Sequence, residues 1–296
     1  MELDLRSVIG LGVAGNFTGH LEQAGEASDF AGVEAEAGKP KGVFPFYVPP
    51  PENTPGSGEH FLHTYPLSRD TIEHPGTIAG RPAKLQIEPE VALLCELVYA
   101  DGDGGTRAVA DVRPTYFTAY NDCSTRRPDA TKISQKKNWG ANTKGLADDQ
   151  WIALDRFEPG GVLDRFRLAC FLRRGDELLA YGEDSPVAGP GGYGTMYRPL
   201  LDWLVDRLNH QRDTGPLEDM PRWLEVADYP ERAVISIGAT RYTAVGESTF
   251  LEPGDEAIVV VYDGEVYPAE ALASRIDGDQ SLENAACLRQ RVVARS

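Results

Sequence analysis

The chain has 296 residues, 41% of them hydrophobic, so it is long enough to bury a substantial core. Its formal net charge of −17 opposes general binding to nucleic acid or to an anionic membrane. No stretch approaches 18 consecutive apolar residues, and the N-terminus lacks the basic-then-apolar layout of a signal peptide, so we expect a cytoplasmic protein without membrane contact.

The first informative segment, residues 7–17, is a short apolar strand that runs into a G-x-G-x-x-G pattern. This pattern indicates dinucleotide binding only when a helix starts within the glycines and an acidic residue ends a second strand about 20 residues later. Neither condition holds, because no convincing strand precedes residues 34–36, so a Rossmann oxidoreductase is the weakest alternative. A short helix is predicted to begin at His20, and a lone histidine there is ordinarily a surface residue.

Residues 38–80 are rich in proline and glycine, which predicts an irregular excursion or lid. The following segment, residues 84–98, has β-type composition and carries Glu88 and Glu90 in its apolar run. Residues i and i+2 of a strand point to the same face, so the two carboxylates are predicted to lie side by side.

Two like charges flanked by apolar residues repel and are partly desolvated unless a proton or a cation neutralises them. A hard divalent cation is the natural partner, because Mg²⁺, Mn²⁺ and Ca²⁺ favour carboxylate oxygens. The alternative is an exposed edge strand on which Glu88 and Glu90 face water.

Residues 101–105 predict a hairpin turn, after which an aromatic β-type run from residue 116 ends at Asp122. Asp122 is either the N-cap of a helix or a third carboxylate aimed at the same site. Further on, Lys144 lies in a glycine-bounded loop with Trp139, and lysines in such loops are usually solvated.

The second half of the chain alternates strand and helix patterns. We predict, in order, a hairpin over residues 162–181, an amphipathic helix over 197–208, a buried strand over 233–241, a strand between turns over 250–264, and a C-terminal helix over 281–291.

Taken in chain order, these segments resemble the fumarylacetoacetate hydrolase family along nearly the whole chain. The matching motifs are Asn16-Phe17 with His20, Glu88 with Glu90, Asn121-Asp122 with Ser124 and Arg126, Trp139 with Lys144-Gly145, Gly238-Ala239-Thr240, and Leu251-Glu252-Pro253-Gly254-Asp255. The resemblance implies an α+β, mostly β fold with a mixed β-roll or β-sandwich. It also implies a catalytic domain over residues 81–296, a small α/β N-terminal portion over residues 1–80, and a homodimer.

The resemblance further implies a site for Mg²⁺, or for Mn²⁺ or Ca²⁺, held by Glu88, Glu90 and Asp122. The ion would chelate neighbouring oxygens of a small anionic 2-oxo acid or β-dicarbonyl substrate and stabilise developing enolate charge. His20 would then be the general base, and Lys144 a second positive group at the oxyanion.

Three more residues receive substrate-binding roles from the resemblance. Thr240, or the backbone near Gly238, would hold a substrate carboxylate, and Arg126 would support Asp122 or the substrate anion.

One departure from the family pattern concerns the catalytic base, because many small relatives have glutamate three residues after the histidine, where this chain has Gln23.

Glu22, one residue earlier than that position, is therefore the candidate relay partner of His20. The family's aspartate after the turn arginine is also missing and is replaced by Arg127. The leading expectation is metal-dependent hydrolysis of a C–C bond in an acylpyruvate-like or β-dicarbonyl acid. Decarboxylation, hydration or isomerisation of a 2-oxo acid is the alternative chemistry, and a non-catalytic metal-binding or ligand-binding homologue is favoured by Gln23.

Overall fold

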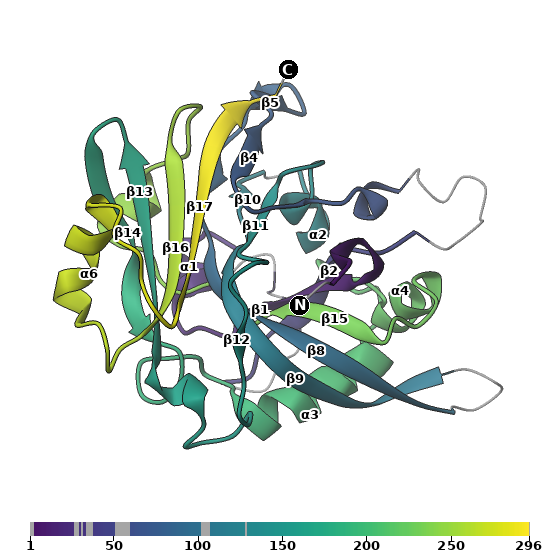
Figure 1. Cartoon of the computed structure of the whole chain (residues 1–296). Helices are drawn as coiled ribbons and strands as arrows, with labels where there is room; N and C mark the ends of the chain where they lie inside the picture. The colour runs from purple at the N-terminus through teal and green to yellow at the C-terminus, as the bar shows by residue number, and fades with distance from the viewer. Residues whose placement is uncertain are drawn as a thin grey trace.

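The computed structural model describes residues 3–26, 30, 32–33, 38–50, 60–101, 107–127 and 129–295. Two large curved sheets face each other across the molecule, and most of the helices lie at its periphery (Figure 1). This confirms the prediction of a mostly β, α+β protein.

The larger sheet has eight strands in the order β2-β1-β15-β8-β9-β11-β3, with β12 also paired to β9. Its strands are β1 (Ile9–Ala14), β2 (Gly42–Tyr47), β3 (Leu67–Ser68), β8 (Pro89–Asp101), β9 (Arg107–Asn121), β11 (Lys144–Leu146), β12 (Ile152–Ala153) and β15 (Arg232–Ser236). β1 pairs in parallel with β15, and β2 pairs with β1. Strands from the first 80 residues therefore extend the same sheet as β8, and a domain boundary at residue 80 stays a prediction.

The smaller sheet has five strands in the order β14-β13-β16-β17-β4. They are β4 (Thr71–His74), β13 (Phe166–Arg174), β14 (Glu177–Pro186), β16 (Glu256–Asp263) and β17 (Ala285–Ala294). Two further pairs are antiparallel: β5 (Thr77–Ile78) with β6 (Arg81–Pro82), and β7 (Leu85–Gln86) with β10 (Ser124–Thr125).

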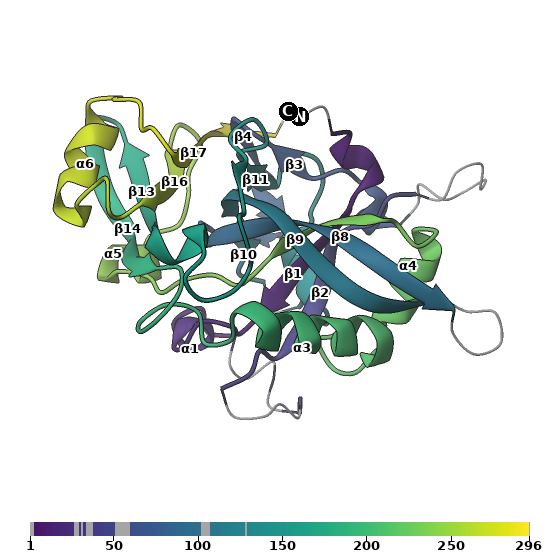
Figure 2. The same cartoon turned by 60° about the horizontal axis from the view of Figure 1, so that its bottom comes forward.

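The described helices are α1 (His20–Gln23), α2 (Ile133–Lys137), α3 (Tyr197–His210), α4 (Met220–Val226), α5 (Ala244–Ser248) and α6 (Ala269–Asp277). Short 3₁₀ turns occur at Leu5–Ser7, Phe61–His63 and Val162–Arg165. The longest helix, α3, runs beneath β8, β9 and β2, whereas α6 covers the outer side of the smaller sheet (Figure 2).

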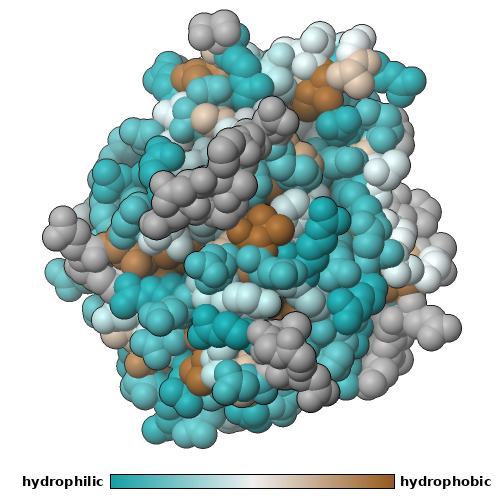
Figure 3. Space-filling view, turned by 90° about the vertical axis from the view of Figure 1, so that its right-hand side faces the viewer, coloured by the Kyte–Doolittle hydropathy of each residue, from teal (hydrophilic) through white to brown (hydrophobic). Residues whose placement is uncertain are grey.

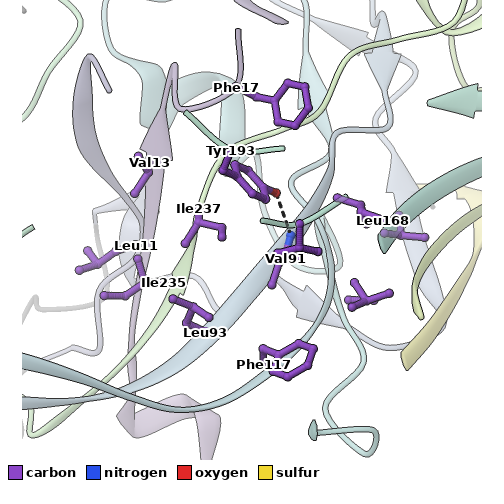
Figure 4. Packing of buried hydrophobic residues seen from close by; sticks show 14 of the residues in the cluster. Leu11, Val13, Phe17, Val91, Leu93, Phe117, Leu168, Tyr193, Ile235 and Ile237 are labelled. Carbon is purple, nitrogen blue, oxygen red and sulfur yellow. Dashed lines mark hydrogen bonds between the residues drawn. The ribbon is translucent and has the colours of Figure 1, made fainter. Parts of the chain in front are cut away.

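The main core lies between the two sheets and fixes the central strand β8. Val91 and Leu93 of β8 pack with Phe117 of β9 and with Leu168 of β13 (Figure 4). The alternating residues Ala92 and Leu94 of β8 belong to a second apolar cluster on the opposite side of the sheet. Because β8 is buried on both faces, the side chains at its start are held in fixed positions.

Several sequence predictions are confirmed. The hairpin is β13–β14, the amphipathic helix is α3, the strands at 233–241 and 250–264 are β15 and β16, and a short helix begins at His20. Residues 102–105 of the predicted turn between β8 and β9, and residues 51–59 of the proline-rich excursion, lie outside the described residues.

The expectations for two segments are wrong. The C-terminal segment 281–291 is not a helix but leads into β17, where alternate residues such as Ala286, Leu288 and Val292 are buried. A period of two is the pattern of a strand, and its pairing with β16 decides the conformation. The exposed-edge alternative for the carboxylate strand also fails, because β8 lies between β15 and β9.

The surface is mainly polar. On the face shown in Figure 3, hydrophobic residues form only small separate groups. Among the described residues Val266 is the one large hydrophobic residue classed as exposed. No helix within the described residues is both long and apolar enough to cross a membrane.

Candidate metal centre

Three carboxylates meet where β8 begins and β9 ends. Glu88 directly precedes β8, Glu90 is the second residue of β8, and Asp122 directly follows β9. The last residue of β9, Asn121, pairs with Pro89 of β8. One oxygen from each carboxylate lies within 4.8 Å of the others, and all three residues are buried. The structure therefore brings the three side chains together. Asp122 caps no helix, because β10 follows it.

Two lysine ammonium groups contact this cluster. Nζ of Lys137, the last residue of α2, lies 2.5 Å from Glu88 Oε2 and 2.6 Å from Asp122 Oδ2. Nζ of Lys144 on β11 lies 3.2 Å from Asp122 Oδ1 and donates a hydrogen bond to the Cys123 carbonyl. Lys144 is fully buried, so the expectation that it is solvated is wrong.

The guanidinium of Arg126 braces the cluster from another side. Its Nη2 atom lies 2.8 Å from Glu88 Oε1, and its Nη1 atom lies 2.8 Å from Glu26 Oε1. It also donates to the Gln86 side chain (2.5 Å) and to the Tyr242 hydroxyl (2.8 Å). Arg126 therefore contacts Glu88 and not Asp122, which was one of the two partners that the resemblance implied; the other, a substrate anion, stays a prediction.

His20 lies beside the carboxylates with both ring nitrogens facing polar atoms. Nδ1 is 2.8 Å from the Thr240 carbonyl oxygen, and Nε2 is 3.8 Å from Glu88 Oε2. A carbonyl only accepts, so Nδ1 carries a proton, and Nε2 is the ring nitrogen that faces Glu88. Nearby, the Gly238 N–H donates to Glu90 Oε2 at 2.9 Å, from a backbone with φ of 112° that favours glycine.

The two residues expected to complete a relay with His20 behave differently. The side-chain amide of Gln23 pairs with the backbone of Tyr242, accepting from its N–H at 2.9 Å and donating to its carbonyl at 3.1 Å. Gln23 thus fastens α1 to the loop that carries Thr240. Glu22 is exposed, and within the described chain no hydrogen bond or ion pair joins it to His20.

Sequence reasoning missed two charged members of this network, Lys137 and Glu26. Lys137 follows Lys136 in a basic run, and nothing in the sequence indicates which of the two faces inward. Glu26 follows α1 and is buried against Arg126 and Lys136. A buried acid after a predicted helix gives no periodic signal, so only the tertiary structure identifies it.

The protonation of the two glutamates is set by opposing effects. Burial alone would raise the pKa of Glu88, but the charges of Lys137 and Arg126 hold it well below its usual range. Burial and the neighbouring Asp122 charge raise the pKa of Glu90 well above its usual range. The surroundings therefore favour the ionised form of Glu88 and the protonated form of Glu90.

The cluster also retains oxygens that accept no hydrogen bond. Glu88 Oε1 and Asp122 Oδ2 are buried without a hydrogen bond of acceptable geometry, although cations lie 2.8 and 2.6 Å from them. Hard carboxylate oxygens with free lone pairs are the donors that Mg²⁺, Mn²⁺ and Ca²⁺ prefer. The three residues therefore fit a divalent ion, although its identity does not follow from the donor set.

Comparison with known proteins gives a family and a fold. The sequence profile of a family of unknown function (DUF5718) matches residues 26–292, and no curated protein matches the sequence. The crystal structure of Cg1458 with an inhibitor is similar with a TM-score of 0.51 and 14% identity, covering 97% of this chain and 77% of that one. Yeast ynq8, a fumarylacetoacetate hydrolase family protein, has a TM-score of 0.50 and 14% identity, covering 98% and 95%. The fold predicted from the motifs is confirmed.

Proposed function

The chain belongs to the family of unknown function DUF5718, and we propose that it is a divalent-metal-dependent enzyme that hydrolyses a C–C bond in an acylpyruvate-like or β-dicarbonyl acid. The observation that supports this most is the buried group of Glu88, Glu90 and Asp122, with one oxygen of each within 4.8 Å of the others. Burying three carboxylates together is costly, and such sites are more often functional than structural.

The charged residues around the cluster suit an anionic substrate. When bound by the three carboxylates, Mg²⁺, Mn²⁺ or Ca²⁺ would supply Lewis-acid polarisation of two neighbouring substrate oxygens. The ammonium group of Lys144, held by Asp122 and the Cys123 carbonyl, adds positive charge in a buried site, where such charge stabilises negative charge best. Arg126 holds Glu88 in place through its contact at 2.8 Å.

His20 is the proposed general base. Because the Thr240 carbonyl fixes the proton on Nδ1, Nε2 faces the cluster as an acceptor. It would take a proton from the water that adds to a substrate carbonyl and later return it to the carbon that leaves as an enolate. Thr240 is also the proposed contact for a substrate carboxylate, whereas the Gly238 N–H is already engaged by Glu90.

One observation favours a second reaction at the same site. The position three residues after His20 is Gln23, whose amide is occupied by the Tyr242 backbone, so it is not an acidic partner for the histidine. A decarboxylation of an oxaloacetate-like acid needs no activated water and would tolerate this change. A homodimer with a catalytic domain over residues 81–296 is likewise a proposal that comes from the resemblance, and a cytoplasmic location is a proposal that comes from the sequence composition.

The test is calorimetric titration of wild type and of the double variant Glu88→Gln/Glu90→Gln with Mg²⁺ and Mn²⁺, with and without oxalate as a 2-oxo acid mimic. The control is Glu265→Gln/Glu270→Gln, which removes the same charge from two exposed residues. We expect binding in wild type and control and its loss in the site variant. Acylpyruvates and oxaloacetate assayed on the same samples identify the reaction from its products, and absence of metal binding in wild type under every condition refutes the proposal.

A further inference from the structure

We infer that Lys137 is a resident counter-cation of the carboxylate cluster, and that a divalent ion bridging Glu88 and Asp122 binds by displacing its ammonium group. The inference rests on the proposed function in one respect only, namely that the cluster binds metal. Beyond that function, it proposes that Lys137 lowers the affinity of the cluster for the metal ion.

The position of the Lys137 ammonium carries the inference. Nζ lies 2.5 Å from Glu88 Oε2 and 2.6 Å from Asp122 Oδ2, so it bridges two of the three carboxylates that would ligate the ion. Its side chain is 4% exposed, and solvent does not screen the contact. A divalent ion on the same two oxygens would need the same space and would be repelled by the ammonium at close range.

The other two cations are placed differently. Lys144 contacts the second oxygen of Asp122 at 3.2 Å and also donates to the Cys123 carbonyl, so it lies beside the cluster instead of between its members. Arg126 reaches Glu88 Oε1 and is fixed by Gln86, Glu26 and Tyr242. Removing either would break contacts outside the carboxylate group.

Lys137 differs from both, because within the described part of the chain its ammonium has few contacts outside the carboxylate group. Apart from Glu88 and Asp122, its ammonium lies near the ring of Phe44, 5.5 Å from the centroid. It stands at the end of the five-residue helix α2, where the flexible four-carbon side chain can move without unfolding the helix. The carboxylate cluster is therefore neutralised in part by the Lys137 ammonium, which can move away when a metal ion binds.

The experiment compares Mn²⁺ affinity by calorimetry in wild type, Lys137→Met and Lys136→Met. Lys136 precedes Lys137 on α2 and contacts Glu26 at 3.3 Å, so its replacement removes the same charge nearby without touching the metal-binding carboxylates. We expect Lys137→Met to bind Mn²⁺ more tightly by on the order of tenfold or more, and Lys136→Met to stay within about twofold of wild type.

Thermal melting provides a second readout if Lys137→Met is unstable without metal. Mn²⁺ should raise its melting temperature more than that of wild type, because stabilisation grows with affinity. Equal or weaker binding by Lys137→Met, with intact binding by wild type, overturns the displacement and leaves the metal proposal standing. If none of the three proteins binds Mn²⁺, both ideas fail.

Discussion

Two buried acidic sites lie against the same short helix, α2, and they differ in their cations. At its end, Lys137 pairs with Glu88, whose pKa is held well below its usual range by Lys137 and Arg126 against the opposing effect of burial. In its first turn, Ser134 donates a hydrogen bond to Glu218, and burial raises the pKa of Glu218 to about 7. Burial is common to both, so the neighbouring cations decide which carboxylate stays charged. That charge is what a metal site needs.

Removing Arg126, one of the two cations beside Glu88, should have the largest effect on stability. Arg126→Met leaves Glu88 and Glu26 without the guanidinium 2.8 Å from each, in a site where the arginine side chain is only 12% exposed. We expect a loss of about 3–5 kcal/mol in the free energy of unfolding, measured by urea denaturation. The control Arg113→Met, at an exposed pair with Asp111, should change it by less than about 0.5 kcal/mol. A loss below about 1 kcal/mol for Arg126→Met would mean that the cluster does not depend on this cation.

The second acidic site gives a pH dependence of predictable sign. The folded protein keeps a proton on Glu218 up to about pH 7, whereas the unfolded chain loses it near the ordinary pKa of 4.5. Stability from this group is therefore complete below about pH 4.5 and is lost as pH rises through 7, by about 3 kcal/mol in all.

The neutral variant Glu218→Gln should lack this component. We would measure urea unfolding of both proteins at pH 5 and pH 8, where wild type should lose about 2.5 kcal/mol more than the variant. Similar losses in the two proteins would show that Glu218 is already charged in the folded state at pH 5.

How far the sequence predicts these sites depends on the range of the interactions involved. Strand periodicity predicts that Glu88 and Glu90 lie side by side, since residues i and i+2 share a face, whereas their role as metal ligands comes from the resemblance. Asp122 comes from the order of motifs, and the structure brings it to the same point through the β8–β9 pairing. Lys137 and Glu218 could not be predicted, because α2 and the segment before α4 reach their acidic partners only through tertiary packing, and a lysine or glutamate outside a strand looks solvated.

The smallest expected effect concerns Glu22, the acid that the sequence assigned to a relay with His20. Glu22 is exposed, unlike both buried acidic sites, and the two ring nitrogens of His20 already face the Thr240 carbonyl and Glu88. An imidazole has no third nitrogen to offer, so Glu22→Gln should leave kcat/KM on the metal-loaded enzyme's best substrate within about twofold and stability within about 0.5 kcal/mol. His20→Gln, as the comparison, should lower kcat by about 10²–10⁴-fold. If Glu22→Gln falls as far as His20→Gln, then α1 must rearrange during turnover so that Glu22 replaces the Thr240 carbonyl as the partner of Nδ1.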